Sequence, residues 1–289
     1  MEAEAQLPGY GGVTGWAALH WRGARWFEGL GEDGRSQRDV TLATGGITMR
    51  PRPGVVASEE GLGPHELLVH DGLALTSAIR SVCFEARYAA TLWRAVSCLD
   101  MAAFNDIVAL CECCAYLTPG LNAWTGVPQA RAAVLLADEN SWSPRETLMR
   151  HVWTIGAGRP RPLCNPPVFD QHGRFIGTPD LLDPEAGVVG EYDGALHLTG
   201  AQRSRDVLRE AAFRGVGLEY VTMLAGDARD PRHFIGRLHA AYPRASCGPV
   251  GPRQWTLEKP PWWVPTETVA QRRALTDEQR RRLLAIRAG

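Results

Sequence analysis

Residues 177–197, GTPDLLDPEAGVVGEYDGALH, constrain the fold of this chain more than any other stretch. Two short apolar runs, each as long as a typical β-strand, are joined by the turn-like sequence DPEAG. If the two runs pair as strands, Asp180 and Glu191 meet at one edge of the sheet. Side chains alternate along a strand, so Asp193 lies on the same face as Glu191.

The segments around this hairpin predict an ordered set of elements over residues 141–245. Ser143, Pro144 and Glu146 form a capping-box start for a helix. Strand-like runs follow at PPVFD, RFIGTPDLL and VVGEYD. A helix over about 202–214 and the strand LEYVTML come next, and PRHFIGRLHAAY predicts a further helix. The predicted order is therefore helix, three strands, helix and strand, followed by that further helix.

The rest of the chain divides around this unit. Residues 1–140 predict a mixed domain, with short strands between Gly- and Pro-rich turns and then several helices. Residues 246–289 form a Pro- and Trp-rich linker and a basic terminal helix that Thr276 and Gln279 cap. The predicted fold class is therefore α/β (α+β), with three segments at 1–140, 141–245 and 246–289.

Composition excludes some partners. The chain has 289 residues, 45% of them hydrophobic, and a net charge of −1, so any attraction to DNA must come from a local patch. No apolar run is long enough to span a membrane, and the first residues carry two glutamates rather than a signal peptide. We expect a cytoplasmic protein without membrane contact. Its seven cysteines are expected to be buried free thiols.

The acidic residues of the hairpin suggest metal chemistry. Asp180 and Glu191 could bind Mg²⁺ or Mn²⁺, because hard cations need only one or two carboxylates and water. Glu146 could add a third carboxylate, and His197 could transfer protons. Two simpler interpretations remain open: Glu146 as a helix cap alone, and the other acids as the solvated face of a hairpin.

These residues resemble the PD-(D/E)XK family of restriction-endonuclease-like domains, in its branch near the very-short-patch-repair endonucleases. The resemblance is carried by SPRETLMR, GTPDLL, GEYDGALH and RSRDVLREAAFRGVG, and covers about residues 141–242. It implies Asp180 and Glu191 as metal ligands and Glu146 as an auxiliary acid. It also implies His197 as the proton-handling residue.

One position departs from the family pattern. Asp193 stands where the motif has a lysine, and the only lysine, Lys259, lies in the tail. Four neighbouring carboxylates cannot all ionise cheaply, so without metal at least one pKa should rise. The site is expected either to bind cations or to be inactive.

Basic residues offer candidate DNA contacts. Arg205 and Arg209 lie one turn apart on the helix after His197 and could grip phosphates. A solvated helix face with Asp206 and Glu210 as partners is the alternative. The tail from 271 to 287 has six arginines and two acids, which would suit contact with DNA. A surface helix without a ligand, or contact with a second copy of the chain or a protein partner, is the alternative. Trp262 and Trp263 are expected to pack the tail onto the body of the protein.

The first segment resembles the middle region of actinobacterial type IV antitoxins of the AbiEi-like kind. This resemblance rests on the string from Thr14 to His20 and on TS-x-x-R at Thr76–Arg80. Such proteins usually begin with a winged-helix segment, whereas about a dozen residues precede the string here.

The two resemblances lead to three functional hypotheses. The first is a metal-dependent DNA endonuclease in phage defence or DNA repair. The second is a non-catalytic DNA-binding regulator or antitoxin of a type IV toxin–antitoxin system. The third is a structural partner that binds through the tail.

Overall fold

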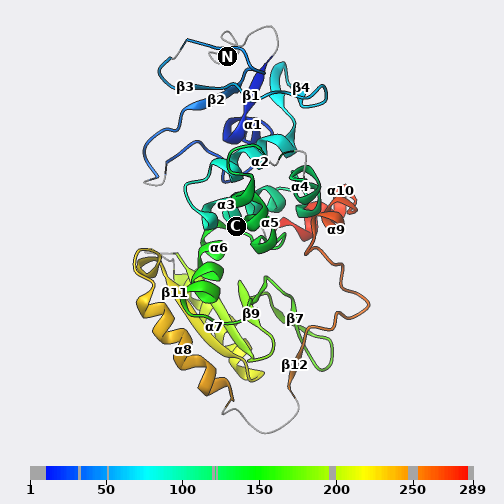
Figure 1. Cartoon of the computed structure of the whole chain (residues 1–289). Helices are drawn as coiled ribbons and strands as arrows, with labels where there is room; N and C mark the ends of the chain where they lie inside the picture. Colours follow the sequence, from blue (N-terminus) through cyan, green and yellow to red (C-terminus); the bar gives the residue numbers. More distant parts are fainter. Residues whose placement is uncertain are drawn as a thin grey trace. The chain divides into compact units, whose positions relative to one another are not determined.

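The computed structural model describes residues 11–31, 34–50, 52–118, 121, 123–194, 200–246 and 253–285, with side chains at 200–206 left aside. The chain is an α/β protein of two units, Met1–Glu139 and Asn140–Gly289 (Figure 1). In the described part, no helix has the length and apolar character needed to cross a membrane.

The first unit contains a five-stranded mixed sheet. Its strands are β1 (Gly12–Thr14), β2 (Val40–Ala43), β3 (Val55–Ser58), β4 (Leu67–His70) and β5 (Leu73–Thr76), in the order β3-β2-β1-β5-β4. β1 is parallel to β5 and β2 to β3, and the other pairs are antiparallel.

The helices of the first unit bury one common core. They are α1 (Gly15–Trp21), α2 (Ala78–Tyr88), α3 (Leu92–Phe104), α4 (Leu110–Tyr116) and α5 (Val127–Leu136). Thr14 precedes α1, and Ser77 caps α2 by accepting a hydrogen bond from the Arg80 amide. The hydroxyl of Thr76 bonds to that of Thr14 at 2.8 Å. The string from Thr14 to His20 therefore starts α1, and Thr76–Arg80 starts α2. The hydrogen bond between Thr14 and Thr76 joins β1 to β5.

A buried arginine network, made of Glu60, Glu66, Arg80 and Arg87, lies beside α2. Arg80 bonds to Glu66 at 2.9 Å and to Glu60 at 3.3 Å, and Arg87 also pairs with Glu60. Both arginine side chains are 2% exposed, and both lie over the Trp124 ring at 5.1 Å. Burial of this kind is tolerated only when the charges remain paired.

The second unit is built on a four-stranded mixed sheet in the order β11-β10-β9-β6. The strands are β6 (Leu163–Cys164), β9 (Leu181–Asp183), β10 (Val188–Asp193) and β11 (Glu219–Leu224). The parallel strands β10 and β11 are connected by α7 (Gly200–Gly215). The other helical elements are α6 (Pro144–His151), the π-helical turn η3 (Val152–Gly156), the 3-10 turn η4 (Ala225–Ala228) and α8 (Arg232–Ser246).

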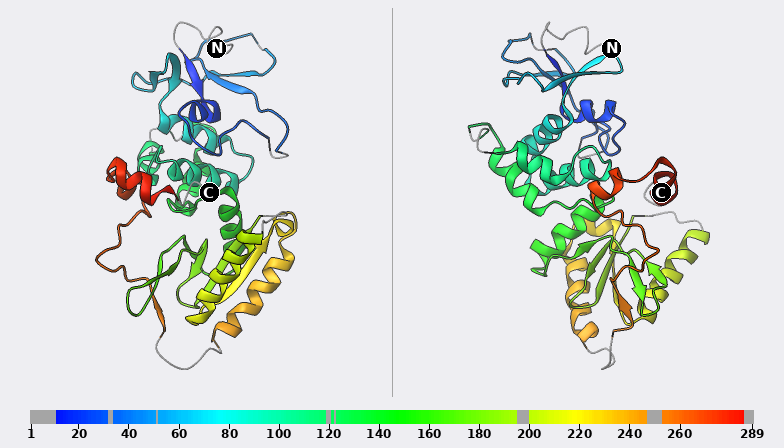
Figure 2. Two further views of the ribbon diagram at one scale, coloured as in Figure 1. Left: turned by 180° about the vertical axis from the view of Figure 1, so that it is seen from behind. Right: turned by 90° about the vertical axis from the view of Figure 1, so that its right-hand side faces the viewer.

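Helices cover both faces of this sheet. Leu181 and Val188 pack with Trp153 of η3 and with α8, while Leu182 and Val189 pack with Phe213 of α7. Figure 2, in its right-hand view, shows α7 and α8 on opposite sides of the strands. Gly190 faces Trp153, where an added Cβ would lie 2.8 Å from the ring, so the sheet and η3 can approach closely only because this residue is glycine.

The expected strand RFIGTPDLL is wrong as a single element. It divides into β8 (Phe175–Gly177) and β9, which lie in different sheets, with Thr178, Pro179 and Asp180 between them. Proline has no amide hydrogen for a ladder, which explains the break. β8 joins β7 (Val168–Asp170) and β12 (Trp255–Thr256) in a three-stranded sheet of order β12-β7-β8.

The C-terminal segment packs as expected. Trp263 stacks on Phe175 with ring centroids 5.2 Å apart, and both Trp262 and Trp263 contact Phe169 edge-on. Two short helices follow, α9 (Val269–Arg273) and α10 (Asp277–Leu283). The predicted cap of α10 is confirmed, since Thr276 and Gln279 exchange hydrogen bonds at 3.0 and 3.2 Å.

The cysteines only partly follow expectation. Cys83, Cys113 and Cys164 are buried free thiols and Cys98 is partly buried. Cys111 and Cys114 are exposed, so the prediction is wrong for them. Of the three cysteines on the short helix α4, only Cys113 is buried in the core, and Cys111 and Cys114 face solvent.

Candidate active site

Glu146 is both a helix cap residue and a member of a buried polar cluster. Its amide donates to the Ser143 hydroxyl at 3.2 Å, which confirms the predicted start of α6. Its Oε2 accepts 2.7 Å hydrogen bonds from the Trp142 amide and from Nδ2 of Asn165. The residue is 7% exposed. The capping interpretation is therefore correct, and it does not exclude a second role.

Asp180 lies immediately before β9, and its hydrogen bonds reach β10 and the residue that follows β6. Its Oδ2 accepts a 2.7 Å hydrogen bond from the Tyr192 amide on β10. Its carbonyl accepts a 3.0 Å bond from the Asn165 amide, which follows β6. The carboxylate is thus held at the edge of the sheet where β9 begins and β10 approaches its end.

Glu191 lies on β10 with its side chain 8% exposed, and it forms an ion pair with Arg209 of α7. The pair uses Oε2, whereas Oε1 is buried and has no hydrogen-bond partner among the described residues. Nε of Arg209 is also buried without one. A buried carboxylate oxygen without a partner is costly, and it marks a place where a cation or a proton donor would be stabilised.

Electrostatics link these groups into one site. Burial and then the neighbouring charge of Asp180 raise the pKa of Glu146 to about 8. Burial raises the pKa of Asp180 to about 6, although the Tyr192 amide and the Arg209 charge act in the opposite direction. Glu146 interacts with Asp180, Asp180 with Arg209, and Arg209 with Glu191. The three acids separated in sequence are therefore linked in a chain, Glu146 to Asp180 directly and Asp180 to Glu191 through Arg209.

The raised pKa of Glu146 predicts a pH dependence of stability. The folded protein holds the Glu146 proton more tightly than the unfolded chain does. The protonated Glu146 side chain therefore stabilises the folded state. This stabilisation is complete below about pH 4.5, the ordinary pKa of a glutamate, and is lost as the pH rises through about 8. In Glu146→Gln the loss of stability between about pH 5 and about pH 9 should be smaller, because glutamine does not titrate. The fold should be kept, since a glutamine oxygen can still accept both hydrogen bonds. Urea unfolding in EDTA measures it.

Glu258→Gln is the control, because Glu258 is an exposed glutamate in the same unit. It should keep the pH dependence of the wild type. Identical pH profiles for Glu146→Gln and the wild type would show that Glu146 titrates near its ordinary pKa and would contradict the prediction.

The other predicted site residues have different outcomes. Asp193 is partly buried at the end of β10, in register with Leu224 of β11. His197 lies outside the described residues, and Arg205 lies on α7 but its side chain is outside the described part. Arg209 contacts Glu191, whereas the sequence suggested a phosphate contact for it.

The pairing of Arg209 with Glu191 has a local cause. Phe213 is four residues further along α7, so the two side chains share one face of the helix. Phe213 is fully buried between α7 and the sheet, against Gly177 and Val189. The face that carries Phe213 therefore directs Arg209 toward the sheet, and the spacing of the two residues could have indicated this.

Asn165 is the site residue that the sequence did not reveal. It is buried, adopts a left-handed backbone conformation with φ of 46°, and donates to Glu146. Its Oδ1 is buried without a hydrogen-bond partner among the described residues. Asparagine tolerates this conformation better than most residues, and its place after β6 and before two prolines was the available signal.

The donor set agrees in chemistry with a hard divalent cation. Carboxylate and amide oxygens are the ligands that Mg²⁺ and Mn²⁺ prefer, and within the described part of the chain Oε1 of Glu191 and Oδ1 of Asn165 are acceptors without a hydrogen-bond partner. Among the described residues, however, no group of three His, Cys, Asp or Glu is arranged to hold a metal ion. The guanidinium of Arg209 supplies the positive charge in this arrangement.

Comparison with known proteins adds no relative. The chain matches no protein-family model, no curated protein and no solved structure. The function therefore has to be inferred from the site itself.

Proposed function

We propose that the second unit is a DNA endonuclease of the PD-(D/E)XK kind that hydrolyses phosphodiester bonds with Mg²⁺ or Mn²⁺, in phage defence or DNA repair. The observation that carries the proposal is the set of contacts that links Glu146 to Asp180 through Asn165 and places Asp180 beside the Tyr192 amide, next to the Arg209–Glu191 pair. One buried oxygen of Glu191 has no hydrogen-bond partner among the described residues. Such groups with shifted pKa values cluster at functional sites.

In this proposal Asp180 and Glu191 hold the cation, and the hydrogen bond donated by the Tyr192 amide keeps the Asp180 carboxylate in position. A bound Mg²⁺ would polarise a phosphate and supply a hydroxide-like nucleophile near neutral pH. Glu146 keeps its proton at neutral pH while the site lacks added positive charge, and releases it when such charge arrives. Arg209 neutralises Glu191 and can turn its guanidinium to a phosphate. Asp193 and His197 stay candidates for assisting proton transfer.

A plasmid assay tests the proposal. The wild-type protein should nick or cut supercoiled DNA in Mg²⁺ or Mn²⁺ and should not do so in EDTA. The rate should fall at least about tenfold on replacing Mn²⁺ with Ca²⁺, which binds oxygen ligands but has a larger and less rigid coordination shell. Failure to cut single-stranded, duplex or supercoiled DNA with any of these ions would contradict the proposal.

A second function is favoured by one specific observation, the ion pair between Arg209 and Glu191. The arginine takes the place of a metal ion and neutralises the Glu191 carboxylate by itself. This is the arrangement expected of a domain that keeps the nuclease fold only to bind DNA. That protein would be a DNA-binding regulator or antitoxin. It would retain DNA in EDTA and take up no Mn²⁺ in calorimetry, whereas the nuclease would show a Mn²⁺ titration that Glu191→Gln removes.

A further inference from the structure

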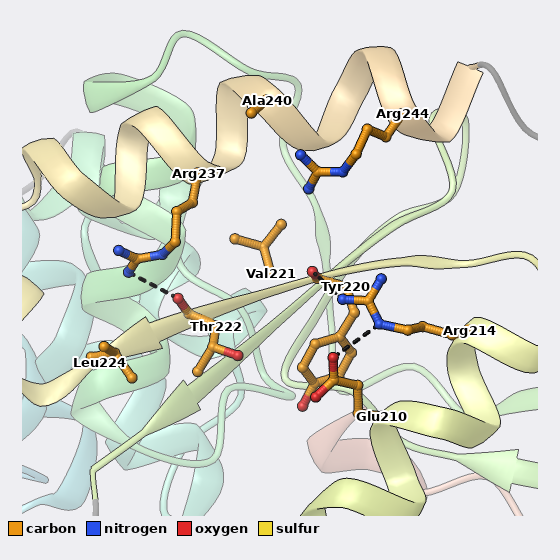
Figure 3. Close-up of a pocket in the computed structure, with 9 residues that line it drawn as sticks. All are labelled: Glu210, Arg214, Tyr220, Val221, Thr222, Leu224, Arg237, Ala240 and Arg244. Atoms are coloured by element: carbon orange, nitrogen blue, oxygen red, sulfur yellow. Dashed lines mark hydrogen bonds and ion pairs between the residues drawn. The ribbon is translucent and has the colours of Figure 1, made fainter.

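A groove runs along the outer edge of β11, outside the candidate active site. Its volume is about 380 Å³, and its floor is formed by β11 with Tyr220, Val221 and Thr222 (Figure 3). Glu210 and Arg214 of α7 form one wall, and Arg237 and Arg244 of α8 the other. Three guanidinium groups and one carboxylate therefore line the groove.

The arginines of the groove are held in place by acids that are more buried than they are. Asp227 is 7% exposed and pairs with Arg237, which is 39% exposed. Glu219 is 14% exposed and bonds to Arg244 at 2.6 and 2.8 Å, while Arg244 is 54% exposed. In these two pairs the guanidinium group is the more exposed partner, whereas Glu210, which pairs with Arg214, is itself 40% exposed. The buried partners preorient the arginines for a ligand.

The same arginines make this edge unsuitable for another strand. β11 is the terminal strand of its sheet, and such edges normally invite pairing. Here the Thr222 carbonyl accepts a 3.0 Å bond from Arg237, and the Tyr220 carbonyl a 3.4 Å bond from Arg214. A peptide strand would have to displace both contacts. An anionic ligand would not, because each guanidinium has five N–H donors.

The spacing of the cations suits a chain of phosphates. Arg237 and Arg244 are seven residues apart, or about 10 Å along α8, which is too far for one phosphate to bridge. Thr222 is also in register with Glu191 on the neighbouring strand. β11 itself lies one strand spacing, roughly 4.8 Å, from the strand that carries the candidate active site, so a ligand on its outer edge lies beyond that distance.

We propose that the β11 groove binds the sugar-phosphate backbone of DNA through Arg214, Arg237 and Arg244. The inference rests on the proposed action on DNA and adds a second contact surface to it. Phosphate contacts of this kind position a duplex without reading its sequence.

Fluorescence anisotropy with a labelled 20-base-pair duplex in EDTA tests the groove. The double variant Arg237→Gln, Arg244→Gln should bind about tenfold more weakly than wild type near 100 mM salt, and the slope of log affinity against log salt should fall by about two. Arg174→Gln is the matched control, because Arg174 is an exposed arginine paired with Asp170 in another sheet and should change little. The double Arg→Lys variant keeps the charge and should stay within about threefold of wild type.

Three results would overturn the proposal. These are wild-type affinity in the double Gln variant, an equal loss in Arg174→Gln, or an affinity for DNA that does not fall as salt is raised. Equal losses in the double Lys and double Gln variants would indicate a structural role and count against it too. The assay needs no metal and no cleavage, so an inactive protein with a functional groove, or a nuclease without one, would be recognised separately.

Discussion

Asp180→Asn should lower the rate of metal-dependent DNA cleavage by about 10³-fold. A cation ligand contributes several kcal/mol of charge stabilisation to phosphodiester hydrolysis, and about 4 kcal/mol corresponds to that factor. The folded structure should survive, because the amide oxygen of asparagine can still accept the Tyr192 hydrogen bond. Loss of the charge near Glu146 should even lower the pKa of Glu146. Single-turnover cleavage at saturating DNA and metal measures the effect.

Asp230→Asn is the control for this change, because Asp230 is a surface aspartate of the same unit, paired with Arg232. It should keep the wild-type rate. DNA binding in EDTA should be within about twofold of wild type in both variants, since neither residue is an arginine of the groove. Wild-type cleavage by Asp180→Asn would remove Asp180 from the active site, whatever the groove does.

Arg80→Met should destabilise the first unit by about 3 kcal/mol. Arg80 is buried and paired with both Glu60 and Glu66, so its removal takes away positive charge that offsets these two carboxylates. Burial alone would raise the pKa of Glu66, but hydrogen bonds from Tyr116 and Gly63 and the charge of Arg80 hold it below its ordinary value. Contact with the Trp124 ring is lost as well. Chemical denaturation, followed by circular dichroism, reports the change.

Arg38→Met is a matched comparison. Arg38 also pairs with a glutamate, Glu85, and also lies near a tryptophan ring, Trp16, but it is 44% exposed. Its removal should cost less than about 1 kcal/mol, as for other solvent-exposed pairs. Equal losses from the two variants would mean that burial does not set the strength of the buried arginine network.

Features encoded locally were predictable from the sequence. The start of α6 follows from Ser143 and Pro144, and β10 follows from the apolar run before Glu191. Caps and alternation act over a few residues, so they need no knowledge of the rest of the fold. The approach of Asp180 to Glu191 was predictable for the same reason, because a short turn joins their strands.

Features that depend on distant partners were harder to predict. Pro179 could have indicated the break after β8, but the second sheet that β8 joins is completed by β12, which lies about 80 residues further along the chain and pairs with β7. The role of Asn165 depends on the position of Glu146, 19 residues before it. The partner of Arg209 depends on which face of α7 packs on the sheet. Each of these results from long-range packing, which periodicity along one segment does not record.

The attachment of the C-terminal segment affects how the second unit can be isolated. β12 extends the sheet that contains β7, and Trp262 and Trp263 cover Phe169 and Phe175. A shortened protein that stops near residue 246 would expose this aromatic surface and the unpaired edge of β7, and both invite aggregation. Any excised version intended for crystallisation or enzymology should therefore retain the chain through Trp263.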